Sequence, residues 1–206
     1  MDFLKVALYI LAAVAILLLA ICLVCYRMAF FVSKKDRTPV GEYPVPQGKI
    51  YEPYHEQMIR WMKEVRAMPY KDYYITSFDG LRLHAKFYEY APGAPIEIMF
   101  HGYRGSAERD LCGGIQRCFA LQRSILLVDQ RGSGQSEGNT ITFGIREHRD
   151  CVDWAYFAAK EFGPERKLIL TGISMGASTV LMAAGKKLPE NVVGVLADCG
   201  FTTARE

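Results

Sequence analysis

The stretch LILTGISMGASTVLMAA, residues 168–184, decides the fold of this 206-residue chain. Its opening apolar run predicts a short buried strand, and its closing half has apolar residues at the spacing of a helix. Between the two stands G-x-S-x-G, formed by Gly172, Ser174 and Gly176. The glycines permit a turn too tight for side chains, which lifts the serine hydroxyl above the sheet and aims the helix N-terminus at developing negative charge. A chance match is the competing explanation, but the flanking strand and helix make Ser174 a candidate nucleophile.

The sequence upstream of this stretch and just after it alternates strands with helices. An antiparallel hairpin is predicted over 73–90, because two runs rich in β-branched and aromatic residues are split by an Asp-Gly pair at 79–80. Further strands are expected at 96–100, 125–128 and 192–196, with amphipathic helices between them. This order predicts an α/β fold with a mostly parallel sheet, whose sites form at the carboxyl ends of the strands.

A His-Gly pair follows the strand predicted over 96–100. At this place such a fold supplies its second oxyanion donor, so the hole is expected to combine the backbone N–H groups of Tyr103 and Met175. The phenol of Tyr103 is a further candidate donor. His101 precedes the nucleophile and lies on the oxyanion loop, so we expect it to fix the loop and not to act as a base.

A glycine-rich loop, DQRGSGQS at 129–136, follows the strand over 125–128. Its G-x-G suggests dinucleotide binding, but the glycines come after Asp129 and Arg131 and no helix opens directly behind them. We therefore expect a structural loop beside the catalytic turn, braced by an ion pair between Asp129 and Arg131.

Together these strand ends resemble the α/β-hydrolase superfamily, and within it the serine aminopeptidase-like and monoacylglycerol-lipase-like members. The resemblance covers about 73–205. It rests on H-G-Y at 101–103, D-x-R-G-x-G-x-S at 129–136, G-x-S-x-G at 172–176 and D-C-G-F at 198–201. The resemblance implies acyl transfer from a small ester or amide to water by a Ser-His-Asp/Glu triad, with no metal or organic cofactor.

The chain departs from the family in its histidines. The family order is Ser, then acid, then His, yet every histidine here precedes Ser174: His55, His84, His101 and His148. A serine needs a neutral imidazole within hydrogen-bond reach to attack near neutral pH. Asp198, at the end of the last strand, is a possible acid, although this position is more often structural.

Two explanations of the missing base stay open. The chain is a fragment of a longer hydrolase, truncated after the sixth strand, or a complete but inactive relic. We favour the fragment, because the sequence stops as it enters another helix and would leave the sixth strand as an apolar edge. The competing functions are a non-catalytic binding protein of the same fold and an acyltransferase that uses the same serine.

A run without charged residues, 6–26, predicts a membrane-spanning helix. A signal peptide is the alternative, but the run is long and no A-x-A cleavage pattern follows. Lys5 precedes the run, whereas four basic residues follow it closely, so the positive-inside rule favours a cytoplasmic soluble domain.

Residues 38–72 are expected to be a Pro-rich linker and an amphipathic helix with a Met/Trp stripe, used for packing or laid against the membrane. The expected organisation is therefore an anchor at 1–37, this connecting region, and an incomplete hydrolase domain at 73–206. A net charge of +3 does not indicate nucleic-acid binding. Four cysteines outside the apolar run are unpatterned and are interpreted as buried reduced thiols, not as metal ligands. Oligomeric state is not indicated.

Overall fold

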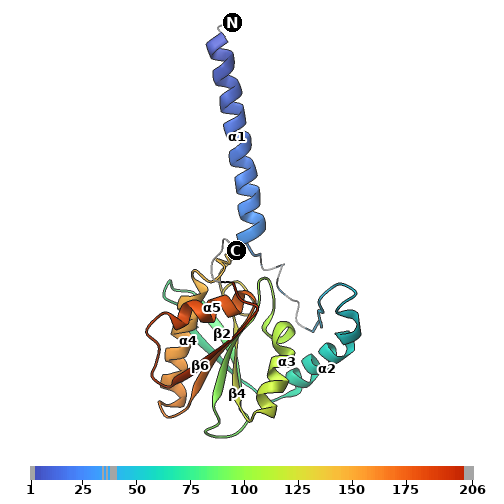
Figure 1. Cartoon of the computed structure of the whole chain (residues 1–206), viewed down its shortest axis with the longest axis vertical. Helices are drawn as coiled ribbons and strands as arrows, with labels where there is room; N and C mark the ends of the chain where they lie inside the picture. Colours follow the sequence, from blue (N-terminus) through green and yellow to red (C-terminus); the bar gives the residue numbers. More distant parts are fainter. Residues whose placement is uncertain (1–2, 34, 36, 38–40, 202–206) are drawn as a thin grey trace. The chain divides into compact units, whose positions relative to one another are not determined.

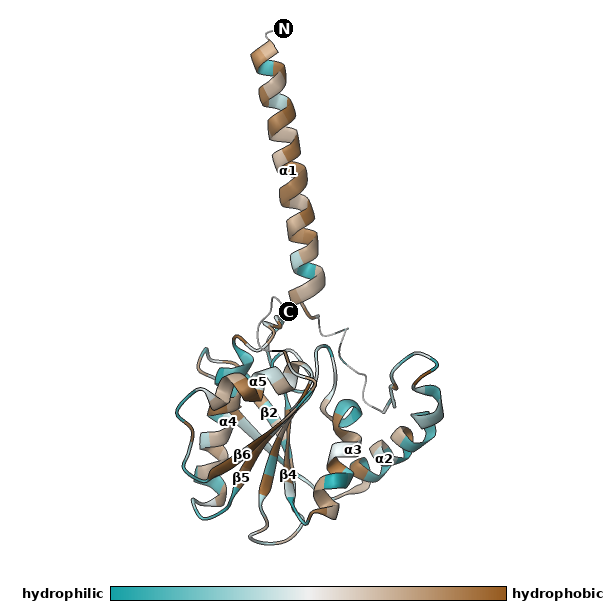
Figure 2. Cartoon of the chain, viewed as in Figure 1, coloured by the Kyte–Doolittle hydropathy of each residue, from teal (hydrophilic) through white to brown (hydrophobic). Residues whose placement is uncertain are grey.

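The computed structural model describes residues 3–33, 35, 37 and 41–201. They form two compact units, residues 3–31 and residues 32–201. The first unit is dominated by helix α1 (Phe3–Phe30), which extends the predicted run at both ends. Its 28 residues reach about 42 Å, more than the ~30 Å of a hydrocarbon core. Apolar residues occupy most of its length (Figure 2), so α1 is long and apolar enough to cross a membrane.

The second unit is built on one sheet of six strands in the order β1-β2-β4-β3-β5-β6. The strands are β1 (Lys71–Thr76), β2 (Arg82–Tyr88), β3 (Ile96–Phe100), β4 (Ser124–Asp129), β5 (Leu168–Ile173) and β6 (Val192–Asp198). The β1–β2 and β2–β4 pairs are antiparallel, and the β4–β3, β3–β5 and β5–β6 pairs are parallel. The predicted fold, a hairpin followed by parallel strands, is confirmed.

Helices cover both faces of this sheet (Figure 1). They are α2 (His55–Ala67), α3 (Ala107–Ala120), α4 (Glu147–Phe162) and α5 (Met175–Ala184), with a short 3₁₀ turn, η2 (Glu52–Tyr54), before α2. Helices α2 and α3 lie on one side of the sheet, and α4 and α5 on the other. A parallel sheet covered on both faces buries its strands along their length, and β3 is buried throughout and β4 up to its last residue. Most of these residues are apolar, and the one buried acid of β3, Glu97, is paired with Arg117 and Arg123.

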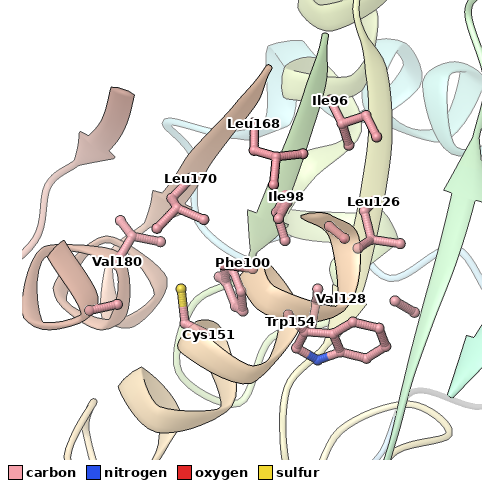
Figure 3. Close-up of a cluster of buried hydrophobic side chains, with 14 of the residues drawn as sticks. Ile96, Ile98, Phe100, Leu126, Val128, Cys151, Trp154, Leu168, Leu170 and Val180 are labelled. Carbon is pink, nitrogen blue, oxygen red and sulfur yellow. The ribbon is translucent and has the colours of Figure 1, made fainter. Parts of the chain in front are cut away.

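Alternation along β3 shows how the two cores are divided. Ile96, Ile98 and Phe100 face α4 and α5, where the indole of Trp154 is fully buried (Figure 3). Met99 faces the opposite way and packs with α3. Each fully buried side chain of this size contributes about 1.5–3 kcal/mol, so burial on both faces stabilises the sheet from whose carboxyl edge the loops extend.

The Met/Trp stripe of α2 is a packing face. Met62 and Val65 are fully buried, and α2 packs along α3. Gly113 of α3 leaves room for Trp61, whose ring would press on any side chain placed there. The described parts of the connecting region, 41–72, therefore belong to the same compact unit as the sheet; residues 38–40 lie outside the described residues.

The prediction of four buried thiols is wrong at one position. Cys112, Cys118 and Cys151 are buried, whereas Cys199 is exposed. The physical reason is its place in the fold: Cys199 directly follows β6, which is an edge strand in the part of the chain that the structure describes. The apolar pattern of a strand does not reveal whether its neighbour is present.

Candidate active site

The turn between β5 and α5 has a strained backbone. Ser174 is its central residue, with φ 54° and ψ −120°, which lies outside the regions that a side chain ordinarily allows. A Cβ on Gly172 would overlap the backbone of Gly176, and a Cβ on Gly176 would overlap the carbonyl of Phe100. Both glycines of the motif are therefore required by close backbone approach.

Hydrogen bonds attach the end of β6 to this turn. The Ser174 N–H donates to the Asp198 carbonyl at 2.8 Å, and the Phe201 N–H donates to the Ser178 hydroxyl at 2.8 Å. These bonds hold the chain after β6 against the first turn of α5. Asp198, predicted as a possible acid, is thus beside Ser174 through its backbone, and its residue is exposed.

The loop after β3 lies against the serine. A Cβ placed on Gly102 would be 3.5 Å from the Cβ of Ser174, so the following residue, Tyr103, is close to the turn. Met175 is the first residue of α5, and its N–H therefore has no carbonyl partner within the helix. The Tyr103 phenol accepts a hydrogen bond from Nε of Arg104 at 2.8 Å, and its ring stacks on Phe143 with centroids 5.0 Å apart.

His101 is buried and its two ring nitrogens are both engaged. Nδ1 lies 2.9 Å from the Gly102 carbonyl, and Nε2 lies 3.2 Å from the Gln130 N–H. A carbonyl needs a donor and an N–H needs an acceptor, so Nδ1 donates to the first and Nε2 accepts from the second. His101 therefore ties the loop after β3 to the glycine-rich loop, the structural role expected from the sequence.

The other histidines are engaged away from Ser174. His55 contacts the Pro46 carbonyl and His148 the Gly144 carbonyl, each at 2.8 Å. His84 lies between Asp129 at 2.8 Å and Asp72 at 2.7 Å. Burial opposes the charge of this ring, but the hydrogen bonds to the two carboxylates raise the pKa of His84 above its usual value. Among the described residues, no histidine hydrogen-bonds the Ser174 hydroxyl.

The predicted pairing of Asp129 with Arg131 is wrong. Asp129 instead accepts from the backbone N–H of Gln135 at 2.9 Å and pairs with His84, its register partner on β2. Successive residues of a strand point to opposite faces, and beyond the strand end the direction of each side chain is set by the loop. Proximity in sequence was therefore a poor guide to pairing.

Arg131 is held by two carboxylates from distant parts of the chain. Asp150 of α4 takes its Nε and one terminal nitrogen at 2.6 and 2.7 Å, and Asp79 of the β1–β2 turn takes both terminal nitrogens at 2.9 and 3.1 Å. The hydrogen bonds from Arg131 lower the pKa of Asp79 to about 2. Burial raises the pKa of Asp150 to about 6 in spite of the same guanidinium. Neither partner is apparent from the sequence around Arg131.

The glycine-rich loop is thus held by charged side chains beside the serine turn. Its only sequence signal was an arginine followed by glycines, with no indication of which acids would face it. Among the described residues, no group of three or more His, Cys, Asp or Glu side chains is arranged to hold a metal ion.

Comparison with known proteins identifies the family. Residues 98–205 match the α/β hydrolase fold family, which is more than half of the chain. The chain belongs to this family. The match covers the loop after β3, the glycine-rich loop and the serine turn together.

Solved structures agree on the fold. An esterase from Pyrococcus furiosus is 22% identical, with a TM-score of 0.60 over 76% of this chain and 56% of its own. The α/β hydrolase GrgF from Penicillium sp. sh18 is 25% identical, with a TM-score of 0.53 over 63% of this chain and 45% of its own. The chain thus spans about half the length of these hydrolases.

Proposed function

We propose that this protein is a membrane-anchored serine hydrolase that transfers the acyl group of an ester or small amide to water, with Ser174 as nucleophile. The observation that carries the proposal is the backbone of Ser174, φ 54° and ψ −120°, between two glycines that admit no side chain. Strain of this kind costs about 1–3 kcal/mol and persists where function requires it. A serine that served only to begin a helix would adopt ordinary N-cap dihedrals without this cost.

The proposed chemistry needs stabilisation of an oxyanion. The N–H of Met175 and the N–H of Tyr103 are the proposed donors, because both belong to segments that lie against Ser174. As the tetrahedral intermediate forms, its oxygen gains charge that these N–H groups and the N-terminus of α5 stabilise. One such donor contributes about 2.7–4 kcal/mol in the transition state.

Among the described residues, none of the four histidines is placed to act as the general base of the triad. The proposed enzyme therefore draws its histidine from residues beyond Glu206, in a longer form of the protein, and Asp198 remains a candidate acid. Resemblance to serine aminopeptidase-like and monoacylglycerol-lipase-like enzymes supports this triad. The same serine in an acyltransferase, or a non-catalytic binding protein of the same fold, are the alternatives.

Labelling of Ser174 by a fluorophosphonate, together with p-nitrophenyl ester turnover, tests the proposal. The 206-residue chain is expected to label poorly and to show no readily detected turnover, because residual catalysis without a triad is only about 10³–10⁴ over water. A form extended beyond Glu206 is expected to do both, and Ser174→Ala in that form abolishes both. Turnover in the extended form that survives Ser174→Ala would reject the assignment. Robust turnover by the short chain would move the base to an upstream histidine.

Membrane anchoring through α1 is the second part of the proposal. The support is the length and apolar composition of α1 and the basic residues that follow it, which also favour a cytoplasmic hydrolase unit. The protein is expected to stay with membranes through high-salt and carbonate washes, and protease added to intact cells should leave the hydrolase unit uncut. A shortened protein recovered in the soluble fraction would identify 6–26 as a signal peptide instead.

A further inference from the structure

Two described residues that follow the first compact unit, Val32 and Arg37, lie in the wall of the candidate site. Val32 is buried, its N–H donates to the Asn139 carbonyl at 2.8 Å, and its side chain packs with Ile141 and Met175. The N–H of Met175 is one of the two proposed oxyanion donors. A side chain that precedes the sheet by about 40 residues in sequence therefore supports the start of α5.

Arg37 extends this contact to the glycine-rich loop. One terminal nitrogen donates to the carbonyls of Gly134 and Ser136 at 2.9 and 2.8 Å, and the other donates to the carbonyl of Gly138 at 3.0 Å. Three carbonyls that point at one guanidinium impose a curved path on the loop. Gly134 and Gly138 both have positive φ, as this path requires.

A cavity of about 20 Å³ shows that these residues reach the site itself. Val32 and Arg37 line it together with His101 of the oxyanion loop and Met175 of the serine turn. The cavity is the size of about one water molecule, so little space separates Val32 and Arg37 from Met175. A shift of Val32 or Arg37 would be felt by Met175 through direct packing.

We propose that Val32 and Arg37 are positioning residues of the active site. They hold the loop 131–141 against Met175, and so keep the N–H of Met175 aimed at the oxygen of the reacting acyl group. The catalytic part of this inference rests on the proposed function. Val32 is the first residue after the unit that contains α1, and Arg37 follows it closely in sequence.

The geometry requires arginine in particular. The guanidinium is a rigid planar fork with five donors, which allows one side chain to serve three carbonyls. A lysine offers one small charged group on a flexible stem, and a glutamine offers a shorter neutral amide. Arg37→Gln should therefore release the loop, and Arg37→Lys should retain part of the effect.

Hydrogen exchange on the whole chain in detergent tests the contact without requiring activity. In Arg37→Gln, peptides covering 131–141 and the start of α5 should exchange about tenfold faster, because hydrogen bonds to a charged group no longer oppose local opening. Arg60→Gln is the matched control: Arg60 is an exposed arginine of α2 and should leave these peptides unchanged. Equal exchange in wild type and Arg37→Gln would overturn the proposal.

Kinetics of an ester-hydrolysing form test the positioning role. Arg37→Gln should lower kcat about tenfold with KM nearly unchanged, as expected when an interaction made only in the transition state is misaligned. Arg37→Lys should recover part of kcat, and Arg60→Gln should match wild type. Faster exchange with unchanged kcat would reduce the segment to a purely structural contact and overturn the proposal. Absence of any Ser174-dependent turnover would instead reject the proposed function, while the exchange result would still decide whether the segment holds the loop.

Discussion

The serine turn and the glycine-rich loop lie at carboxyl ends of strands in the same sheet, yet they are held in opposite ways. The turn at 172–176 depends on missing side chains, since two glycines allow backbone to touch backbone. The loop at 131–138 depends on charges, since Arg131 is held by carboxylates 19 and 52 positions away and Arg37 reaches it across about 100 residues. One structure is specified locally, and the other by partners from the whole unit.

The difference also concerns how each region fails. A glycine turn tolerates no added carbon, because its neighbours are backbone atoms that cannot move aside. A buried ion cluster tolerates no missing partner, because a charge left unpaired in the interior loses its compensation. The two regions should therefore respond to different substitutions, and the following experiments separate them from the largest expected effect to the smallest.

Removing the guanidinium at the centre of the loop should have the largest effect. Arg131 and Asp150 are only 3% and 4% exposed, so Arg131→Gln leaves a buried carboxylate without its charge partner. We expect a loss of about 3–5 kcal/mol in the free energy of unfolding, measured by urea denaturation. Arg146→Gln is the control, because Arg146 is largely exposed and its pair with Asp79 is long, at 3.9 Å. This substitution should change the free energy of unfolding by less than about 1 kcal/mol. Equal losses for the two variants would mean that burial does not distinguish these pairs.

The same contrast explains how far the sequence could predict this molecule. The strands, the helices and the serine turn could be predicted because each is written in contiguous residues: apolar periodicity in the elements, and G-x-S-x-G in the turn. The partners of the loop could not. Asp79 was identifiable only as a turn residue, and Asp150 only as part of the polar side of α4.

Sheet register decides such pairings, and it is not visible in a single sequence. His84 and Asp129 face each other because β2 pairs antiparallel with β4, although β3 and α3 intervene in sequence. The hydrogen bonds of Arg37 to the glycine-rich loop could not be predicted either. A basic residue after an apolar helix is already explained by membrane topology, so nothing in the sequence indicated a second, structural contact. Exposure of Cys199 likewise depends on what lies beside β6, and not on its own residues.

Adding one carbon to the serine turn should have the next largest effect. Gly176→Ala places a Cβ against the Phe100 carbonyl, and the backbone must shift to accept it. We expect a loss of about 3 kcal/mol or more in unfolding free energy. Gly194→Ala in β6 is the matched control, because no atom lies within 4 Å of its added Cβ and its φ is not positive. This control should stay within about 0.5 kcal/mol of wild type. A mild Gly176→Ala would show that the turn is not fixed by close approach.

Relieving the backbone strain at Ser174 should have a smaller effect, and this effect should be stabilising. Glycine adopts φ 54° with ψ −120° at little cost, whereas alanine does not. Ser174→Gly should therefore be more stable than Ser174→Ala by about 1 kcal/mol, which is strain relief less the greater chain entropy of glycine. Both variants lack the hydroxyl, so its contribution cancels. At Ser178, within α5, the order should reverse and glycine should be the less stable by about 1 kcal/mol.

The smallest expected effect is the pH dependence that the charged loop has and the glycine turn lacks. Hydrogen bonds from Arg131 lower the pKa of Asp79 from 3.8 to about 2, so the folded state favours the ionised carboxylate. Its stabilisation is complete above pH 3.8 and is lost as the pH falls through about 2. The Asp79 side chain is 28% exposed and solvent screens it, so we expect its contribution to stability to be at most about 1 kcal/mol.

Asp150 acts in the opposite direction at higher pH, because burial raises its pKa to about 6. The test is the difference in unfolding free energy between wild type and Asp79→Asn. Because Asp150 is present in both proteins, most of its own contribution cancels in this difference. This difference should be constant above pH 4 and shrink between about pH 4 and 2. A difference that stays constant through this range would show that the Asp79–Arg131 pair does not change the ionisation of Asp79.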